Sequence, residues 1–131
     1  MSLQIGQQVG SYEITALLGK GGMGEVYRAR DTKLKRDVAI KILPDEFSRD
    51  PGRIARFHRE AQAIAVLNHS NIAGIHGLEE SVDTKFLVLE LVEGETLEER
   101  IRSARLPIED ALNIAHQICE ALEAAHEFLS L

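Results

Sequence analysis

The sequence is poor in the residues that several classes of protein require. It has one cysteine, Cys119, in 131 residues, so an internal disulfide is excluded and a reducing compartment, the cytoplasm, is expected. We expect Cys119 to be a small buried residue on a helix. No apolar run approaches the roughly 20 residues of a membrane span, and no signal peptide is evident. Positive charge is also scarce, because 15 Lys and Arg face 21 Asp and Glu, and the net charge of −6 argues against broad nucleic-acid binding.

Metal-ligand spacing is lacking as well. The five histidines form no HExxH or comparable pattern, so no metal site is expected and surface or packing roles are assigned to His58, His69, His76, His116 and His126. Internal repeats and low-complexity segments are also lacking. With 44% hydrophobic and 27% charged residues, the chain has the composition of one packed domain or of a piece of a larger one.

The first third of the chain favours β-structure. Segments rich in β-branched and aromatic residues predict three strands, over residues 11–18, 25–31 and 36–43. Pro44 should end the third strand. Residues 44–52 are expected to form a loop, in which Asp50 caps the next helix and Pro51 lies in its first turn.

The remainder predicts helices on either side of two further strands. Residues 52–68 have helical periodicity, and residues 69–81 and 84–94 read as strands joined by a hairpin. Thr96, with Glu99 three residues later, is a capping box that opens a short helix. A long amphipathic helix is predicted over residues 108–129, with an apolar stripe of Ile108, Ala111, Leu112, Ala115, Ile118, Cys119, Leu122 and Ala125.

Glycines cluster between the first two predicted strands. Gly19, Gly21 and Gly24 form a GxGxxG pattern, a spacing that dinucleotide-binding folds share. In those folds a helix follows the glycines, whereas Val26 and Tyr27 continue here as a strand. The glycines are therefore expected to join two antiparallel strands as a flap over phosphates. A plain glycine-rich hairpin is the alternative for this segment, and a dinucleotide-dependent oxidoreductase is disfavoured.

A lysine and a glutamate stand out against their apolar surroundings. Ala39 and Lys41 share one face of the third strand, which leaves room for a flat purine with an ammonium beside its phosphates. Glu60 lies on the apolar stripe of the predicted helix, where a carboxylate is costly to bury unless it is paired. Two partners remain open from spacing alone: Arg56 one turn earlier, or Lys41 across the sheet–helix interface.

Four motifs in this order resemble the N-terminal part of a protein kinase, and most closely the bacterial serine/threonine kinases of eukaryotic type. They are LGKGGMGEVYRA, VAIK, FHREAQAIAVLNHSNI and FLVLELVEGETL. The resemblance implies an α+β fold, a kinase-like N-lobe of a five-stranded antiparallel sheet and one helix, followed by two helices of a truncated C-lobe. It divides the chain into an N-terminal extension (1–11), the N-lobe and hinge (12–94) and the start of the C-lobe (95–131).

The resemblance also implies roles for particular residues. Lys41 would hold the α- and β-phosphates of ATP, and Glu60 would position Lys41 as its catalytic partner. Leu18, Val26 and Ala39 would form the upper wall of the adenine slot, Leu89 would limit its depth, and Glu90 and Val92 would form the hinge. Ile64 and Ile75 would tie the helix to the sheet. The lid over the phosphates would comprise Gly19, Lys20, Gly21, Gly22, Met23, Gly24, Glu25 and Val26.

The motifs that perform phosphoryl transfer in such kinases do not occur in these residues. HRD, which supplies the catalytic aspartate, and DFG, which holds Mg²⁺, are both absent. The parent kinase is expected to use ATP and Mg²⁺ on protein serine and threonine, whereas this chain alone is expected to be inactive, without Mg²⁺ ligands and with weak nucleotide binding. The alternative is a non-catalytic kinase-like module that acts through binding. The unpartnered stripe on the terminal helix favours a homodimer.

Overall fold

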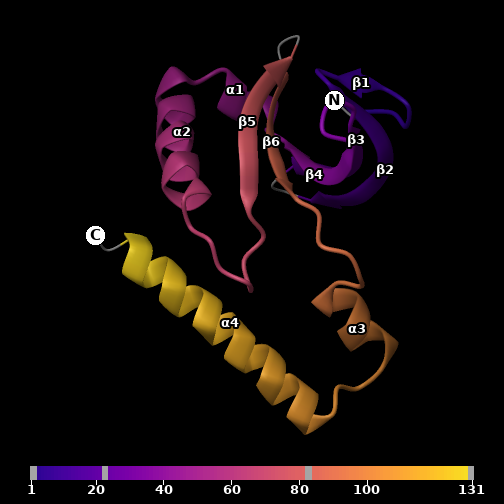
Figure 1. The fold of residues 1–131 in the computed structure, drawn as a ribbon, viewed down its shortest axis with the longest axis vertical. Helices are drawn as coiled ribbons and strands as arrows, with labels where there is room; N and C mark the ends of the chain where they lie inside the picture. Colours follow the sequence, from indigo (N-terminus) through magenta and orange to yellow (C-terminus); the bar gives the residue numbers. More distant parts are fainter. Residues whose placement is uncertain (1–2, 22–23, 82–83, 130–131) are drawn as a thin grey trace.

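The computed structural model describes residues 3–21, 24–81 and 84–129, which form one curled sheet with helices beside and beyond it (Figure 1). All strands pair antiparallel in the order β1-β2-β3-β4-β6-β5. The strands are β1 (Gln8–Val9), β2 (Tyr12–Gly21), β3 (Gly24–Asp31), β4 (Arg36–Ile42), β5 (Ile75–Ser81) and β6 (Thr84–Glu90).

Four helices accompany the sheet, and their bounds are α1 (Asp45–Ser48), α2 (Pro51–Ala65), α3 (Leu97–Ser103) and α4 (Ile108–Leu129). The cap of α2 is the predicted one, because the Asp50 carboxylate accepts from the backbone N–H groups of Gly52 and Arg53. The capping box of α3 is confirmed, with Glu99 N–H donating to Thr96 Oγ1 and Thr96 N–H donating to Glu99 Oε2. Both caps satisfy N–H groups that the first helical turn leaves without partners.

One face of the curled sheet holds the core. Val38, Ile40 and Val88 are at most 1% exposed, and Tyr12 packs edge-on against Phe86 with ring centroids 6.0 Å apart. Full burial of one such aliphatic side chain is worth about 1.5–3 kcal/mol. Because successive strand residues face opposite ways, Ala39 and Lys41 lie on the other face of the same strand.

The α+β architecture is the predicted one, and the structure adds two elements to it. The stretch expected to be an N-terminal extension contributes the short sixth strand β1, which pairs Val9 with Tyr12 and buries Val9 in the core. The expected loop after Pro44 contains the one-turn helix α1, whose Asp45 carbonyl accepts from Arg49 N–H at 3.2 Å. Asp45 and Glu46 in that first turn interact favourably with the positive end of the helix dipole.

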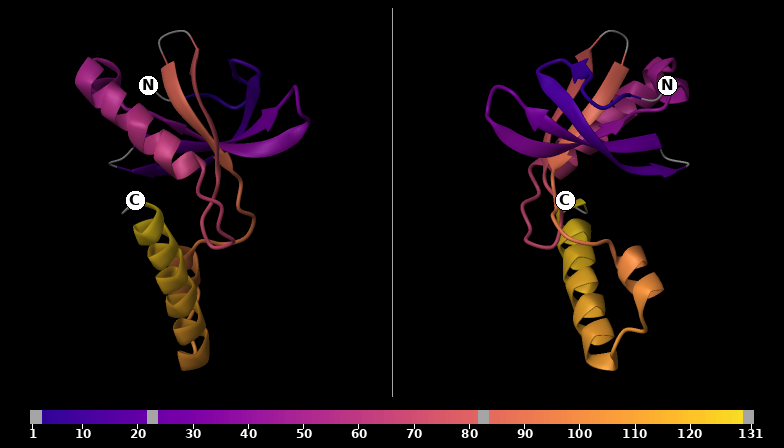
Figure 2. Two further views of the ribbon diagram at one scale, coloured as in Figure 1. Left: turned by 60° about the vertical axis from the view of Figure 1, so that its left-hand side comes forward. Right: turned by 90° about the vertical axis from the view of Figure 1, so that its right-hand side faces the viewer.

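Two further expectations are corrected by the structure. The helix predicted to reach residue 68 ends at Ala65, because Val66 is its C-cap and Leu67 N–H turns back to Ile64 O. Cys119 is exposed on α4 rather than buried as expected. The linker between β6 and α3 comprises residues 91–96. Figure 2 shows α3 and α4 beyond the end of the sheet from which this linker departs. Among the described residues, no helix is long and apolar enough to cross a membrane.

Candidate functional site

The glycine-rich segment forms the end of β2, up to Gly21, and the start of β3, from Gly24. Cross-strand pairs run from Gly19 with Val26, through Lys20 with Glu25, to Gly21 with Gly24. The expected hairpin of two antiparallel strands is therefore present. Gly22 and Met23, which complete the predicted lid, lie outside the described residues.

Gly24 is a position where a side chain does not fit. Its φ of +105° lies in the region that favours glycine, and a Cβ would come within 2.7 Å of Ile42 O. The hairpin thereby lies directly against the end of β4. Gly19 differs, because a Cβ there would meet nothing within 4 Å.

The side chains near the hairpin are partly paired. Lys20 Nζ lies 3.4 Å from Glu25 Oε1, and the Tyr27 hydroxyl donates a hydrogen bond to the other Glu25 oxygen. The same hydroxyl accepts from Leu3 N–H at 2.9 Å, which fastens the N-terminal segment to β3. Leu18, a predicted wall of the adenine slot, is 50% exposed.

Two rows of residues cross the sheet beside the hairpin. One row is Val26, Lys41 and Leu87, and the next is Arg28, Ala39 and Leu89. Paired residues of antiparallel strands point to the same face, so both rows lie on the face opposite the core. Ala39 is buried, and Leu89 is half-buried. Val26, Ala39, Lys41 and Leu89 therefore lie on one face of the sheet.

Glu60 has the nearer of its two expected partners. Its carboxylate accepts from Arg56 Nε at 3.0 Å, one turn earlier on α2, and both side chains are more than half exposed. Within the described ranges, Lys41 forms no ion pair. The cross-interface pair of Lys41 with Glu60 is therefore not formed in this structure, whereas the local alternative is. Ile64 and Ile75, the residues expected to tie helix to sheet, are half-buried where α2 contacts β5.

The last residue of β6, directly before the linker, is fastened to the segment before β5. Glu90 N–H donates to Gly74 O at 2.8 Å, and the Glu90 carboxylate accepts from Gly74 N–H at 2.9 Å. Val92 is 68% exposed. The two predicted hinge residues thus lie on a segment held at its start and open to solvent two residues later.

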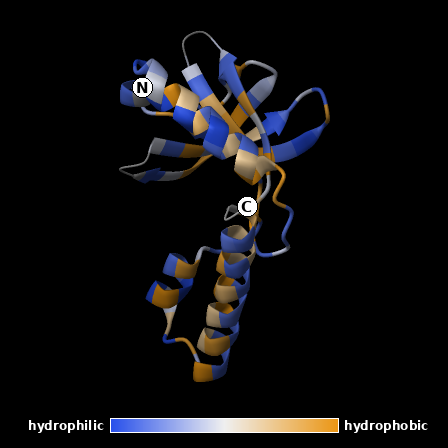
Figure 3. Ribbon diagram, turned by 90° about the vertical axis from the view of Figure 1, so that its left-hand side faces the viewer, coloured by the Kyte–Doolittle hydropathy of each residue, from blue (hydrophilic) through white to orange (hydrophobic). Residues whose placement is uncertain are grey.

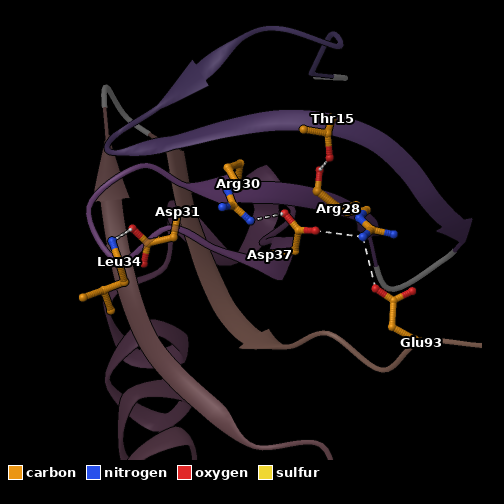
Figure 4. Close-up of polar contacts among 7 residues, drawn as sticks. All are labelled: Thr15, Arg28, Arg30, Asp31, Leu34, Asp37 and Glu93. Atoms are coloured by element: carbon orange, nitrogen blue, oxygen red, sulfur yellow. Dashed lines mark hydrogen bonds and ion pairs between the residues drawn. The ribbon is translucent and has the colours of Figure 1, made fainter.

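A charged cluster that the sequence reasoning missed joins the sheet to the same linker (Figure 4). Arg28 Nη2 lies 2.8 Å from Asp37 Oδ2 and 3.1 Å from Glu93 Oε1, while Arg30 Nη1 reaches Asp37 Oδ1 at 3.3 Å. The hydrogen bond from Arg28, followed by that from Arg30, lowers the pKa of Asp37. Opposite charges on adjacent predicted strands could have signalled the Arg28–Asp37 contact, but no sequence signal points to Glu93.

An open groove lies between the linker and α4. It has a volume of about 730 Å³ and is lined mainly by apolar residues, including Ile72, Leu91, Ile114 and Ile118. Asn71 Nδ2 donates to Gln117 O at 3.2 Å across one end of it. No cluster of three or more His, Cys, Asp or Glu able to hold a metal ion occurs in the part of the chain that the structure describes.

Comparison with known proteins gives concordant matches. The profile of the protein kinase domain family matches residues 12–129. Serine/threonine-protein kinase PrkC of Bacillus subtilis is 45% identical over 94% of this chain, and serine/threonine-protein kinase PknA of Mycobacterium tuberculosis is 43% identical over 96%. The crystal structure of the M. tuberculosis PknI kinase domain superposes with a TM-score of 0.82 at 27% identity, over 96% of this chain. The chain spans only 19% of PrkC, 31% of PknA and 51% of the PknI chain.

Proposed function

Because the chain belongs to the protein kinase domain family, we propose that it forms the nucleotide-binding part of a serine/threonine protein kinase. The longer enzyme would transfer the γ-phosphate of ATP to serine or threonine of protein substrates in the cytoplasm. The observation that carries the proposal is the pair of rows beside the glycine hairpin, with a buried Ala39 and Lys41 two residues along the same face.

The adenine ring is proposed to lie on the sheet face around Ala39. Its walls would be Leu18, Val26 and Leu89, and backbone groups of Glu90 and Val92 would read its edge. Ala39 leaves room for a flat ring because a larger side chain would fill that space. Gly24, where an added Cβ would come within 2.7 Å of Ile42 O, keeps side-chain bulk out of the hairpin, which suits a flap over phosphates.

Lys41 is proposed to hold the α- and β-phosphates, as a point charge beside developing negative charge. In the assembled enzyme Glu60 would exchange Arg56 for Lys41 and so orient the ammonium group. Both Glu60 and Arg56 are exposed, and an exposed i,i+4 pair is worth only about 0.3–0.5 kcal/mol, so its loss would cost little. The lid residues Gly19 to Val26 would fold over the phosphates.

Mg²⁺, when bound with ATP, neutralises charge on the transferred phosphoryl group. The motifs that would hold it, and the catalytic aspartate, do not occur in residues 1–131. We therefore expect the 131-residue polypeptide to bind nucleotide weakly and to transfer no phosphate. Catalysis here depends on groups placed around the phosphates, and this part of the protein supplies only some of them.

Calorimetric titration of the 131-residue polypeptide with ATP, with and without Mg²⁺, tests the proposal. Wild type should bind weakly, and Lys41→Met should weaken binding by about tenfold or more, since a charge-assisted contact is lost. Lys33→Met, on the exposed turn between β3 and β4, is the matched control and should leave affinity unchanged. Binding that ignores Lys41 would contradict the assigned site, and tight Mg²⁺-dependent binding would show that the residues present suffice for a complete one.

A further inference from the structure

We propose that Arg28 is a positioning residue that fastens the linker after β6 to the sheet. It thereby holds in place the backbone groups proposed to form hydrogen bonds with the adenine edge. The inference rests on the proposed function for its consequence, but the fastening itself stands on the contacts of the described residues. Arg28 belongs to the row with Ala39 and Leu89, so it lies at the edge of the proposed adenine slot.

One nitrogen of Arg28 contacts two carboxylates from different parts of the chain. Nη2 lies 2.8 Å from Asp37 on β4 and 3.1 Å from Glu93 on the linker. The first contact joins two neighbouring strands, and the second crosses 65 residues of sequence. Arg28 thus connects the rigid sheet to a segment that is otherwise exposed (Figure 4).

The contact with Asp37 explains why the bridge to Glu93 differs from an ordinary surface pair. An exposed ion pair contributes little because two long side chains must be ordered to form it. Here Asp37 already orders the Arg28 guanidinium, and Arg30 helps to hold Asp37 at 3.3 Å. Only Glu93, which is 69% exposed, remains to be ordered.

The chain has a second fastening point three residues before Glu93, at the last residue of β6. The main chain and carboxylate of Glu90 both bond to Gly74, at 2.8 and 2.9 Å. Leu91 and Val92 therefore lie between two anchored residues, Glu90 before them and Glu93 after them. Restricting a binding segment before the ligand arrives lowers the entropy lost on binding, so loss of either anchor should weaken adenine recognition.

The bridge can be tested by ¹⁵N relaxation on the 131-residue polypeptide. In wild type the backbone order parameters of residues 91–95 should approach about 0.85, and in Arg28→Gln they should fall toward about 0.6. Arg30→Gln is the matched control, because Arg30 contacts Asp37 but not Glu93 in the described structure. The double variant Arg28→Gln with Glu93→Gln should resemble Arg28→Gln alone, since the bridge is already lost. Unchanged backbone chemical shifts at the core residues Val38 and Ile40 would show that each variant keeps the fold.

A second measurement addresses the consequence for binding. ATP affinity should fall about two- to fivefold in Arg28→Gln and by less in Arg30→Gln, which leaves the contact of Arg28 with Glu93 in place. If wild type binds no ATP, the proposed function fails while the order parameters still decide the bridge. Order parameters in Arg28→Gln equal to wild type, or an equal fall in Arg30→Gln, would overturn the fastening role, and unchanged ATP affinity would overturn its link to adenine.

Discussion

Asp31 is a carboxylate that closes the turn between β3 and β4 while being only 3% exposed. Its Oδ1 accepts from the N–H groups of Lys33 at 2.9 Å and Leu34 at 3.1 Å. The hydrogen bond from Leu34 is the largest cause of the lowered pKa of Asp31, which burial opposes. A carboxylate whose pKa is lower folded than unfolded stabilises the protein above its ordinary pKa of 3.8, and this stabilisation is lost as pH falls through the folded pKa.

Asp31→Asn should therefore lower the melting temperature by about 5 °C at pH 7. The difference from wild type should shrink as pH falls below 3.8, because protonation of Asp31 then begins to favour the unfolded chain, in which its pKa is higher. Thermal unfolding followed by circular dichroism across this range measures it. Glu123→Gln, an exposed change on α4, serves as control and should show no pH-dependent difference. A constant difference between pH 7 and pH 3 would contradict the role assigned to the charge.

Individual residues also show what local pattern can and cannot predict. The shared face of Ala39 and Lys41 follows from the period of a strand, so spacing placed them correctly. Spacing alone left both Arg56 and Lys41 as possible partners of Glu60, and the position of α2 relative to the sheet decides between them. Arg28 and Glu93 are 65 residues apart, and their contact depends on where the linker turns after β6.

At the scale of elements, the β2–β3 hairpin depends on Gly24. A side chain there would need the positive φ of +105° and would meet Ile42 O at 2.7 Å. Gly24→Ala should therefore destabilise the chain by about 1–3 kcal/mol, measured by urea unfolding. Gly19→Ala, which adds a Cβ in open space, should change stability by less than about 0.5 kcal/mol. Equal effects of the two changes would exclude a specific steric role for Gly24.

Elements with a chemical start signal were predicted well. Asp50 and the Thr96–Glu99 capping box fixed the beginnings of α2 and α3, because these side chains bond to unpaired N–H groups of the first turn. The end of α2 was placed three residues late, since apolar periodicity continues to Leu67 although the helix stops at Ala65. Strand β1 has only two residues and depends on pairing with β2, so no local sequence pattern predicts it.

At the scale of the whole molecule, the core is confined to the sheet half. From residue 97 to residue 128 no side chain is fully buried, so α3 and α4 contribute no core of their own. The apolar residues recurring along these helices are visible in Figure 3. They include Ile108 at 79%, Leu112 at 65% and Leu122 at 52% exposure. Surface of this kind on one helix face is typical of an interface.

We expect the 131-residue polypeptide to form a symmetric dimer through α4, because pairing two copies of the stripe removes apolar surface from water on both. Sedimentation velocity at tens of micromolar should show a concentration-dependent shift from monomer to dimer. Leu112→Lys should weaken the dimer by about tenfold or more, because it places a charge on the apolar stripe that the dimer would bury. Asn113→Lys adds the same charge on the opposite face of α4 and should leave association unchanged. A monomer throughout this range, or equal effects of the two lysines, would exclude α4 as the dimer interface.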